Sequence, residues 1–194
     1  LHEPDQGSIR YGDRDIAHFS RRELRPLRGE LQMVFQDPFA SLNPRRSIRQ
    51  ILTEPFSIHG IGNRRERRQI VDELIEKVGL HSDFSERYPH EISGGQRQRI
   101  AIARAIALDP SVVVCDEPVS ALDVSVQAQI INLMRRLQAS SGAAYLFISH
   151  DLSVIGYMAD RIAVMYLGEI VEDAPKAALW KEPLHPYTQA LFSA

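Results

Sequence analysis

The sequence has a single cysteine, little net charge and no long apolar run, and each shortage excludes a class of protein. The lone thiol, Cys115, excludes an internal disulfide and a cysteine-rich metal site, and it fits a reducing compartment. A formal net charge of −2 provides no general attraction for nucleic acid or for an acidic membrane surface. No apolar stretch approaches the roughly 20 residues that a membrane-spanning helix requires.

The sequence does contain enough apolar residues for a folded domain. Its 194 residues, of which 44% are hydrophobic, suit one domain with a sizeable core. From residue 94 onward helical and strand patterns alternate, which favours a mainly parallel sheet covered by helices. We predict strands over 112–115, 144–148, 161–166 and 169–172, and helices over 94–108, 126–137 and 152–158. The apolar strands 112–115 and 144–148 are expected to be buried, the first on both faces.

The first half of the chain is more varied. Residues 1–29 are polar and rich in turn residues, with a short strand over 8–11, and a strand over 31–35 runs into a loop fixed by Pro38 and Pro44. Residues 47–90 are expected to be helical, with an amphipathic helix over 64–78 that ends at Gly79. The arginines at 64, 65, 67 and 68 indicate either a solvated helix face or a nucleic-acid patch. Interspersed acidic residues favour the solvated face.

Ser93-Gly94-Gly95-Gln96 is a candidate phosphate-binding segment at the start of a helix. Ser93 is a good N-cap, and the two glycines allow backbone amides to approach an anion closely. The first turn of a helix also presents unpaired amides and the positive end of the helix dipole. For these four residues alone, a capped helix with a glycine turn is the favoured interpretation.

Asp116 and Glu117 end a buried strand, at the position where α/β sheets place their chemistry. In enzymes that hydrolyse phosphate anhydrides, such an aspartate binds Mg²⁺. The adjacent carboxylate can orient and polarise the attacking water as a general base. The alternative interpretation is two surface acids at the start of a loop.

Three further polar residues occupy comparable positions. Gln36 follows the 31–35 strand, where its amide can coordinate Mg²⁺ or position water. His150 follows the 144–148 strand, where an imidazole can contact a terminal phosphate and sense its loss. Asp123 can cap the next helix. Taken singly, each is better explained as an ordinary loop, structural or capping residue.

Together these motifs resemble the ATP-binding cassette (ABC) ATPases, and the extension Gln96–Ala105 matches that family's signature nearly throughout. The resemblance implies an α/β, P-loop NTPase-like fold: a mainly parallel sheet with flanking helices and an inserted helical subdomain. It makes Asp116 the Walker B aspartate, Glu117 the catalytic glutamate and His150 the switch histidine. It also places Gln36 in the Q-loop and Asp123 in the D-loop. The loop that closes on ATP held by another subunit would consist of Ser93, Gly94, Gly95 and Gln96.

The resemblance also implies cofactors and partners. ATP and Mg²⁺ would be bound between two ATPase subunits. The pair would be a homodimer or a heterodimer, with the heterodimer favoured, and nucleic acid would not be a partner. Gln36–Arg45 and Leu184–Leu191 are similar to segments of ATPases that serve dipeptide and oligopeptide importers. Membrane permease subunits, and indirectly an extracytoplasmic solute-binding protein, would then be partners at the cytoplasmic face of the cell membrane. A non-transport ATPase of the same fold and a non-catalytic interaction module are the alternatives.

One motif of the family is absent: no G-x-x-x-x-G-K-[ST] phosphate loop occurs in the sequence. ABC ATPases carry it upstream of a segment like Leu1–Ile9, so we expect a chain truncated at its amino end rather than a degenerate protein. We expect core sheet regions over 1–46 and 110–183, a helical and signature subdomain over 47–109, and the start of a carboxyl-terminal extension over 184–194. Lacking the phosphate loop, the 194-residue chain should bind ATP poorly and have impaired stability. Tight ATP binding in calorimetry would contradict this.

Overall fold

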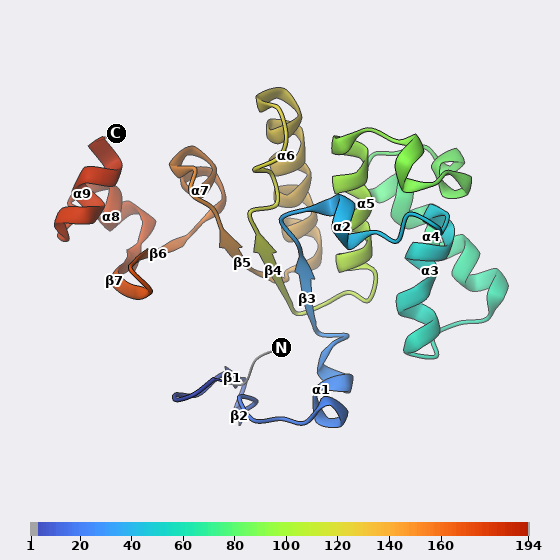
Figure 1. Cartoon of the computed structure of the whole chain (residues 1–194), viewed down its shortest axis with the longest axis horizontal. Helices are drawn as coiled ribbons and strands as arrows, with labels where there is room; N and C mark the ends of the chain where they lie inside the picture. Colours follow the sequence, from blue (N-terminus) through green and yellow to red (C-terminus); the bar gives the residue numbers. More distant parts are fainter. Residues whose placement is uncertain (1–3, 194) are drawn as a thin grey trace.

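The fold is organised around a parallel sheet in the order β3-β4-β5 (Figure 1). The computed structural model describes residues 4–193. Two predicted segments therefore lie partly outside the described residues: 1–9, at Leu1, His2 and Glu3, and the carboxyl-terminal extension, at Ala194. The strands are β3 (Leu31–Val34), β4 (Val112–Asp116) and β5 (Ala144–Ile148). Parallel pairing in the order β3-β4-β5 confirms the α/β class that the alternating pattern predicted.

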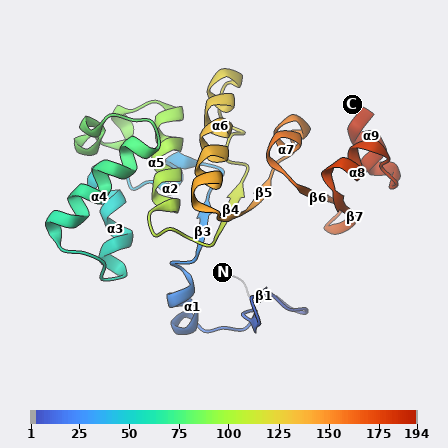
Figure 2. The ribbon, with the colours of Figure 1, turned by 180° about the vertical axis from the view of Figure 1, so that it is seen from behind.

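Only one face of this sheet is buried. Val34, Cys115 and Phe147 are in register on that face and contact the main core, which also includes residues of α5 and α6 (Figure 2). On the other face Leu146 is 58% exposed and Ile148 46%. The prediction that 112–115 is buried on both faces and 144–148 is a buried strand is therefore wrong. The described residues place no helix over the second face, and a continuous apolar run does not reveal which face is covered.

A helical segment connects β3 to β4. It contains α3 (Ile48–Ile58), α4 (Arg64–Lys77), two short 3₁₀ turns (Ser82–Glu86 and Pro89–Glu91) and α5 (Gly94–Ile106). The prediction of helix throughout 47–90 is too broad, because Gly60 and Gly62 adopt left-handed φ angles of 69° and 64° between α3 and α4. The predicted end of α4 is confirmed: Val78 is the C-cap, and Gly79 follows with φ 74°.

Two short helices in the first 41 residues were not predicted. The segment before β3 forms a two-strand hairpin, β1 (Arg10–Tyr11) with β2 (Arg14–Asp15), and then α1 (Arg21–Leu27). Ser20 and Glu23 form a capping box at the start of α1, and this S-x-x-E signal was available in the sequence. The predicted proline-fixed loop contains the one-turn helix α2 (Pro38–Ser41), whose Ser41 carbonyl accepts a 2.6 Å hydrogen bond from Arg104 of α5.

The remainder of the chain follows the predicted order up to residue 175, and two further short helices that were not predicted come after it. After α6 (Val124–Ser141) and β5 come α7 (Leu152–Met158), β6 (Arg161–Tyr166), β7 (Glu169–Pro175), α8 (Lys176–Lys181) and α9 (Pro186–Ser193). The β6–β7 hairpin turns at Leu167 and Gly168 as predicted, with φ angles of 49° and 86°. A second buried cluster, Ile155, Ile162, Val164 and Leu179, joins α7 and α8 to this hairpin. In the described part of the chain, no helix has the length and apolar character needed to cross a membrane.

Candidate functional site

Three of the predicted site residues meet where β3, β4 and β5 end. Gln36 donates a hydrogen bond from Nε2 to Oε2 of Glu117 over 2.8 Å, although the two residues are 81 positions apart in the sequence. Nδ1 of His150 lies 2.8 Å from the other carboxylate oxygen of Glu117. Glu117 thus sits between a neutral amide and an imidazole that come from neighbouring strands. We call Gln36, Glu117 and His150 the strand-end cluster.

The backbone of Glu117 has an unusual conformation. Its φ of 43° lies in the left-handed region, which costs energy for a residue with a side chain. The surrounding structure holds it there: its amide donates to the Ile148 carbonyl over 3.0 Å, and its own carbonyl accepts from the Ser120 hydroxyl over 3.1 Å. The sequence indicated Glu117 but not the part played by Ser120. Asp116 precedes this turn as the last residue of β4.

The Glu117 carboxylate changes the ionisation of His150. It accepts a hydrogen bond from the ring and its negative charge favours the imidazolium, so the pKa of His150 is raised above its ordinary value. The His150 side chain is 74% exposed, against 24% for Glu117. An exposed imidazole beside a more buried carboxylate can contact an anion from solvent while it remains hydrogen-bonded to Glu117.

The same strand ends offer oxygen ligands that suit Mg²⁺. Because Gln36 uses Nε2 toward Glu117, its carbonyl oxygen Oε1 is free of that bond, and Asp116 supplies a carboxylate from the adjacent strand. Among the residues described, no group of three His, Cys, Asp or Glu side chains is arranged to hold a metal ion. A carboxylate and an amide oxygen are kinds of ligand that Mg²⁺ takes alongside water and phosphate oxygens.

Asp123 and Asp151 cap the two helices that follow β4 and β5. Asp123 accepts a 3.0 Å hydrogen bond from the Val126 amide, and this bond is the main cause of a lowered Asp123 pKa. Asp151 accepts from the Ser153 amide over 2.8 Å. Gln127 of α6 also donates to Asp151 over 3.2 Å, a contact between α6 and the residue after His150 that the sequence did not indicate.

The Ser93 segment is a capped helix start, and it is separate from the strand-end cluster. Ser93 Oγ accepts from the Gln96 amide over 3.3 Å and Gln96 Oε1 accepts from the Ser93 amide over 2.9 Å, which forms a capping box. The amides of Gly94 and Gly95 have no intrahelical acceptor and point out of the first turn. In residues 4–193, no hydrogen bond joins this segment to Gln36, Glu117 or His150.

Gly95 serves packing as well. A Cβ atom at this position would lie 2.5 Å from Cγ1 of Val126, closer than real Cβ contacts, whereas at Gly94 the nearest atom would be Leu122 Cδ2 at 3.7 Å. Gly95 therefore permits the close approach of α5 and α6. One of the two glycines is required by the fold independently of any ligand.

The family follows from a comparison with known sequences. The model of the family described as ABC transporter matches residues 1–120. The chain belongs to this family. Within it, the oligopeptide transport ATP-binding protein AppF of Bacillus subtilis is 56% identical across the whole of this chain, which covers 59% of AppF. OppF of the same organism is 51% identical across the whole chain, with 64% of OppF covered. The chain thus spans about three fifths of the length of these curated relatives.

Solved structures support the family assignment. An ATP-binding cassette determined as a dimer in a post-hydrolysis state, bound to ADP and Pi, superposes with a TM-score of 0.79 at 27% identity, covering 90% of this chain and 75% of that one. The protein cbiO1 of Clostridium perfringens, part of the ABC transporter complex cbiONQ, gives 0.82 at 26% identity, covering 94% and 71%. This ABC chain therefore has the P-loop NTPase fold of its family, and the resemblance read from its motifs is confirmed.

Proposed function

We propose that this chain is part of an ATPase that couples ATP binding and hydrolysis to the import of peptides across the cytoplasmic membrane. The observation that carries the proposal is the strand-end cluster, in which Gln36 and His150 hold the two oxygens of Glu117. The names of AppF and OppF, both oligopeptide transport ATP-binding proteins, support peptides as the solute. The ADP- and Pi-bound state of a structural neighbour supports ATP hydrolysis.

In this proposal Glu117 is the general base. Its carboxylate accepts a proton from the attacking water, and its strained backbone fixes the direction in which that carboxylate points. Gln36 orients the carboxylate through its hydrogen bond to Oε2, and His150 does so through its contact with Oε1. Because His150 is mostly exposed and its pKa is raised, it can carry positive charge toward the terminal phosphate while bonded to Glu117.

Asp116 and Gln36 would hold Mg²⁺ through a carboxylate and an amide oxygen, and the ion would neutralise charge on the nucleotide's phosphates. The chain's own contribution to nucleotide binding is the Ser93 segment, with the free amides of Gly94 and Gly95. We assign this segment to ATP bound on a second ATPase subunit, with Asp123 at the subunit interface.

The assembly is proposed as follows. Two ATPase subunits, homo- or heterodimeric, act on membrane permease subunits, and the extracytoplasmic solute-binding protein contacts the permeases. This places the ATPase at the cytoplasmic face of the membrane. Residues 47–109, between β3 and β4, form the helical and signature subdomain of the proposal. Residues 1–46 and 110–183 form the sheet region, and 184–194 begin a carboxyl-terminal extension.

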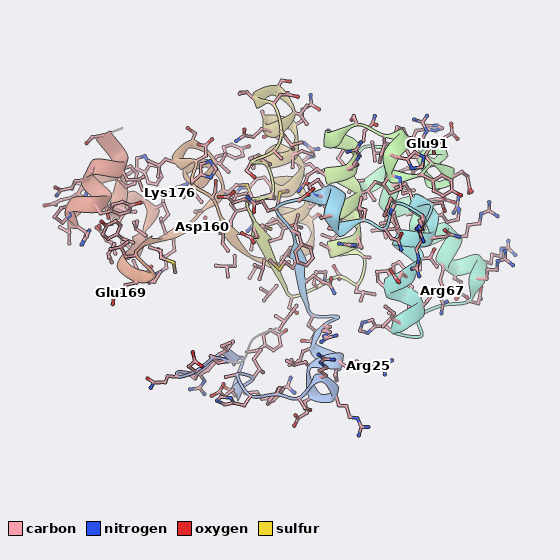
Figure 3. The ribbon with its side chains drawn as sticks, in the orientation of Figure 1. Arg25, Arg67, Glu91, Asp160, Glu169 and Lys176 are labelled. Carbon is pink, nitrogen blue, oxygen red and sulfur yellow. The ribbon has the colours of Figure 1, made fainter. Side chains whose placement is uncertain are left out.

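Uptake of a labelled oligopeptide by vesicles that contain the assembled transporter tests the proposal. Asp116→Asn removes one charge from the proposed Mg²⁺ ligand and should nearly abolish ATP-dependent uptake. Asp160→Asn is a matched control, because Asp160 lies beyond α7 and outside the strand-end cluster (Figure 3). Full uptake by the Asp116 variant would exclude this role, and ATP-dependent uptake of other solutes without peptide would exclude the assigned substrate class.

A further inference from the structure

A groove in the described part of the chain contains no member of the strand-end cluster. It is open, has a volume of about 1010 Å³, and lies along α3 and the first turns of α4, with Glu86 at one side. Arginines from two stretches of sequence, 45–49 and 64–68, line it. They are Arg45, Arg46, Arg49, Arg64, Arg67 and Arg68. We call this feature the arginine groove.

The arginine groove concentrates positive charge in a chain that carries little. Its six arginines are opposed by two lining carboxylates, Glu54 and Glu86, which gives a formal charge of +4 on a chain whose net charge is −2. The interspersed acids of α4 that suggested a solvated face do not line the groove. The acidic residues that alternate with the arginines of α4 in the sequence therefore do not offset the positive charge in the lining of the groove.

Some of these arginines are neutralised within the protein. Arg46 pairs with Glu54 at 2.5 Å. Arg49 pairs with Glu86 at 2.8 Å and with Asp72, which does not line the groove, at 3.1 Å. Arg68 lies 3.9 Å from the same Glu86 oxygen. These pairs tie the helical segment together and leave little charge for a ligand.

Three arginines remain uncompensated. Arg67 donates from Nε to the Ile61 carbonyl over 2.7 Å and from Nη1 to the Ser57 hydroxyl over 2.9 Å, so neutral acceptors orient it (Figure 3). Within residues 4–193, Arg45, Arg64 and Arg67 have no carboxylate at ion-pair distance. Like charges gathered without acidic partners repel one another, and a bound anion would remove that repulsion.

We propose that the arginine groove binds a phosphate-bearing ligand with at least two negative charges. The guanidinium fork matches phosphate oxygens in pairs, and no lysine lines the groove. No aromatic residue lines it either, so it lacks the stacking surface on which nucleic-acid bases bind. The ligand is a soluble polyphosphate ion or the headgroup of an anionic phospholipid, which share this chemistry. The proposal does not rest on ATP hydrolysis.

The test measures the binding of two probes to the 194-residue chain. Physiological ionic strength is used because it screens long-range electrostatic attraction. The two probes are inorganic tripolyphosphate, followed by calorimetry, and phosphatidylglycerol–phosphatidylcholine vesicles, followed by flotation against vesicles of phosphatidylcholine alone. The triple variant Arg45→Gln, Arg64→Gln, Arg67→Gln should weaken binding about tenfold, since exposed charge pairs each contribute a factor of roughly two to five. Tripolyphosphate binding alone indicates a soluble anion, and vesicle binding indicates a lipid.

Matched controls separate the groove from total charge. Changing Arg21, Arg22 and Arg25 of α1 to Gln removes the same charge from an exposed helix and should leave binding unchanged. Because Arg67 also makes internal hydrogen bonds, the double variant Arg45→Gln, Arg64→Gln tests the groove without disturbing them, and it should weaken binding about fivefold. The proposal is overturned if neither probe binds, if the α1 variant weakens binding equally, or if polyglutamate binds as tightly as tripolyphosphate.

Discussion

At the residue scale, most of the contacts that fix the geometry of the site involve Glu117. A left-handed backbone, two side-chain partners and a backbone bond to the Ile148 carbonyl all converge on it. Conformational strain persists only where surrounding contacts hold it in place. The position of this carboxylate is therefore set by β3, β4 and β5 together.

The ionisation of His150 reports directly on this arrangement. Replacing Glu117 with Gln removes the charge and alters the hydrogen bond that favour the imidazolium, so the pKa of His150 should fall toward its ordinary value. An NMR titration of the His150 ring measures it. Glu169→Gln, at the distant β6–β7 turn, should leave the titration unchanged (Figure 3). An unchanged His150 titration in the Glu117 variant would show that the two side chains do not interact in solution.

The sequence indicated candidate residues for this site but not their contacts. Asp116, Glu117 and His150 could be singled out because each lies at or just after the end of an apolar strand. The contact of Gln36 with Glu117 could not, because a strand order with β4 between β3 and β5 is a tertiary property. Nor could the left-handed φ of Glu117 be predicted, since non-glycine residues rarely adopt it.

At the scale of elements, the start of α5 is both a candidate ligand site and a packing contact. Gly95 faces Val126 of α6 with no room for a methyl group, while Gly94 has room. Two adjacent glycines that look equivalent in the sequence thus have different structural roles.

Substitution of each glycine by Ala separates these roles. Gly95→Ala should lower the free energy of unfolding by about 1–3 kcal/mol through overpacking, whereas Gly94→Ala should be close to neutral. Urea unfolding measures both. Adding Val126→Ala to the Gly95 variant should restore part of the loss, because it removes the atom that clashes. Equal stability of the two single variants would exclude the packing role.

Element boundaries were predictable where local chemistry sets them. Gly79 and Gly142 adopt φ angles of 74° and 71° at the ends of α4 and α6, as glycine allows. The sequence marked the first end, but α6 runs to Ser141 rather than to residue 137, because the left-handed cap that ends it is Gly142. The exposure of one face of β5 was not predictable, because an apolar run looks the same whether one face is covered or both are.

At the scale of the whole molecule, β5 connects two buried clusters. Phe147 packs against the main core and also against the cluster that joins α7 and α8 to the β6–β7 hairpin. Its neighbour Leu146 lies on the open face of the sheet and is 58% exposed. Phe147→Ala should therefore lower the free energy of unfolding by about 2–4 kcal/mol, somewhat below the usual range because Phe147 is only partly buried.

The matched control is Leu146→Ala, which should change stability by less than about 1 kcal/mol because the side chain is mostly in solvent. Guanidinium unfolding monitored by circular dichroism compares the two variants. A larger loss for Leu146 than for Phe147 would mean that the open face of the sheet is covered in solution.

The most direct test of the proposed function is Glu117→Gln in an ATPase form that includes a phosphate-binding loop. ATP-dependent dimers, followed by size-exclusion chromatography, should persist, since the Ser93 segment and Asp116 are unchanged. Turnover, followed by phosphate release, should fall about 10²–10⁴-fold, the contribution of a general base. Glu169→Gln should retain full turnover. Undiminished hydrolysis by the Glu117 variant would contradict the assignment of Glu117 as the base at the centre of the strand-end cluster.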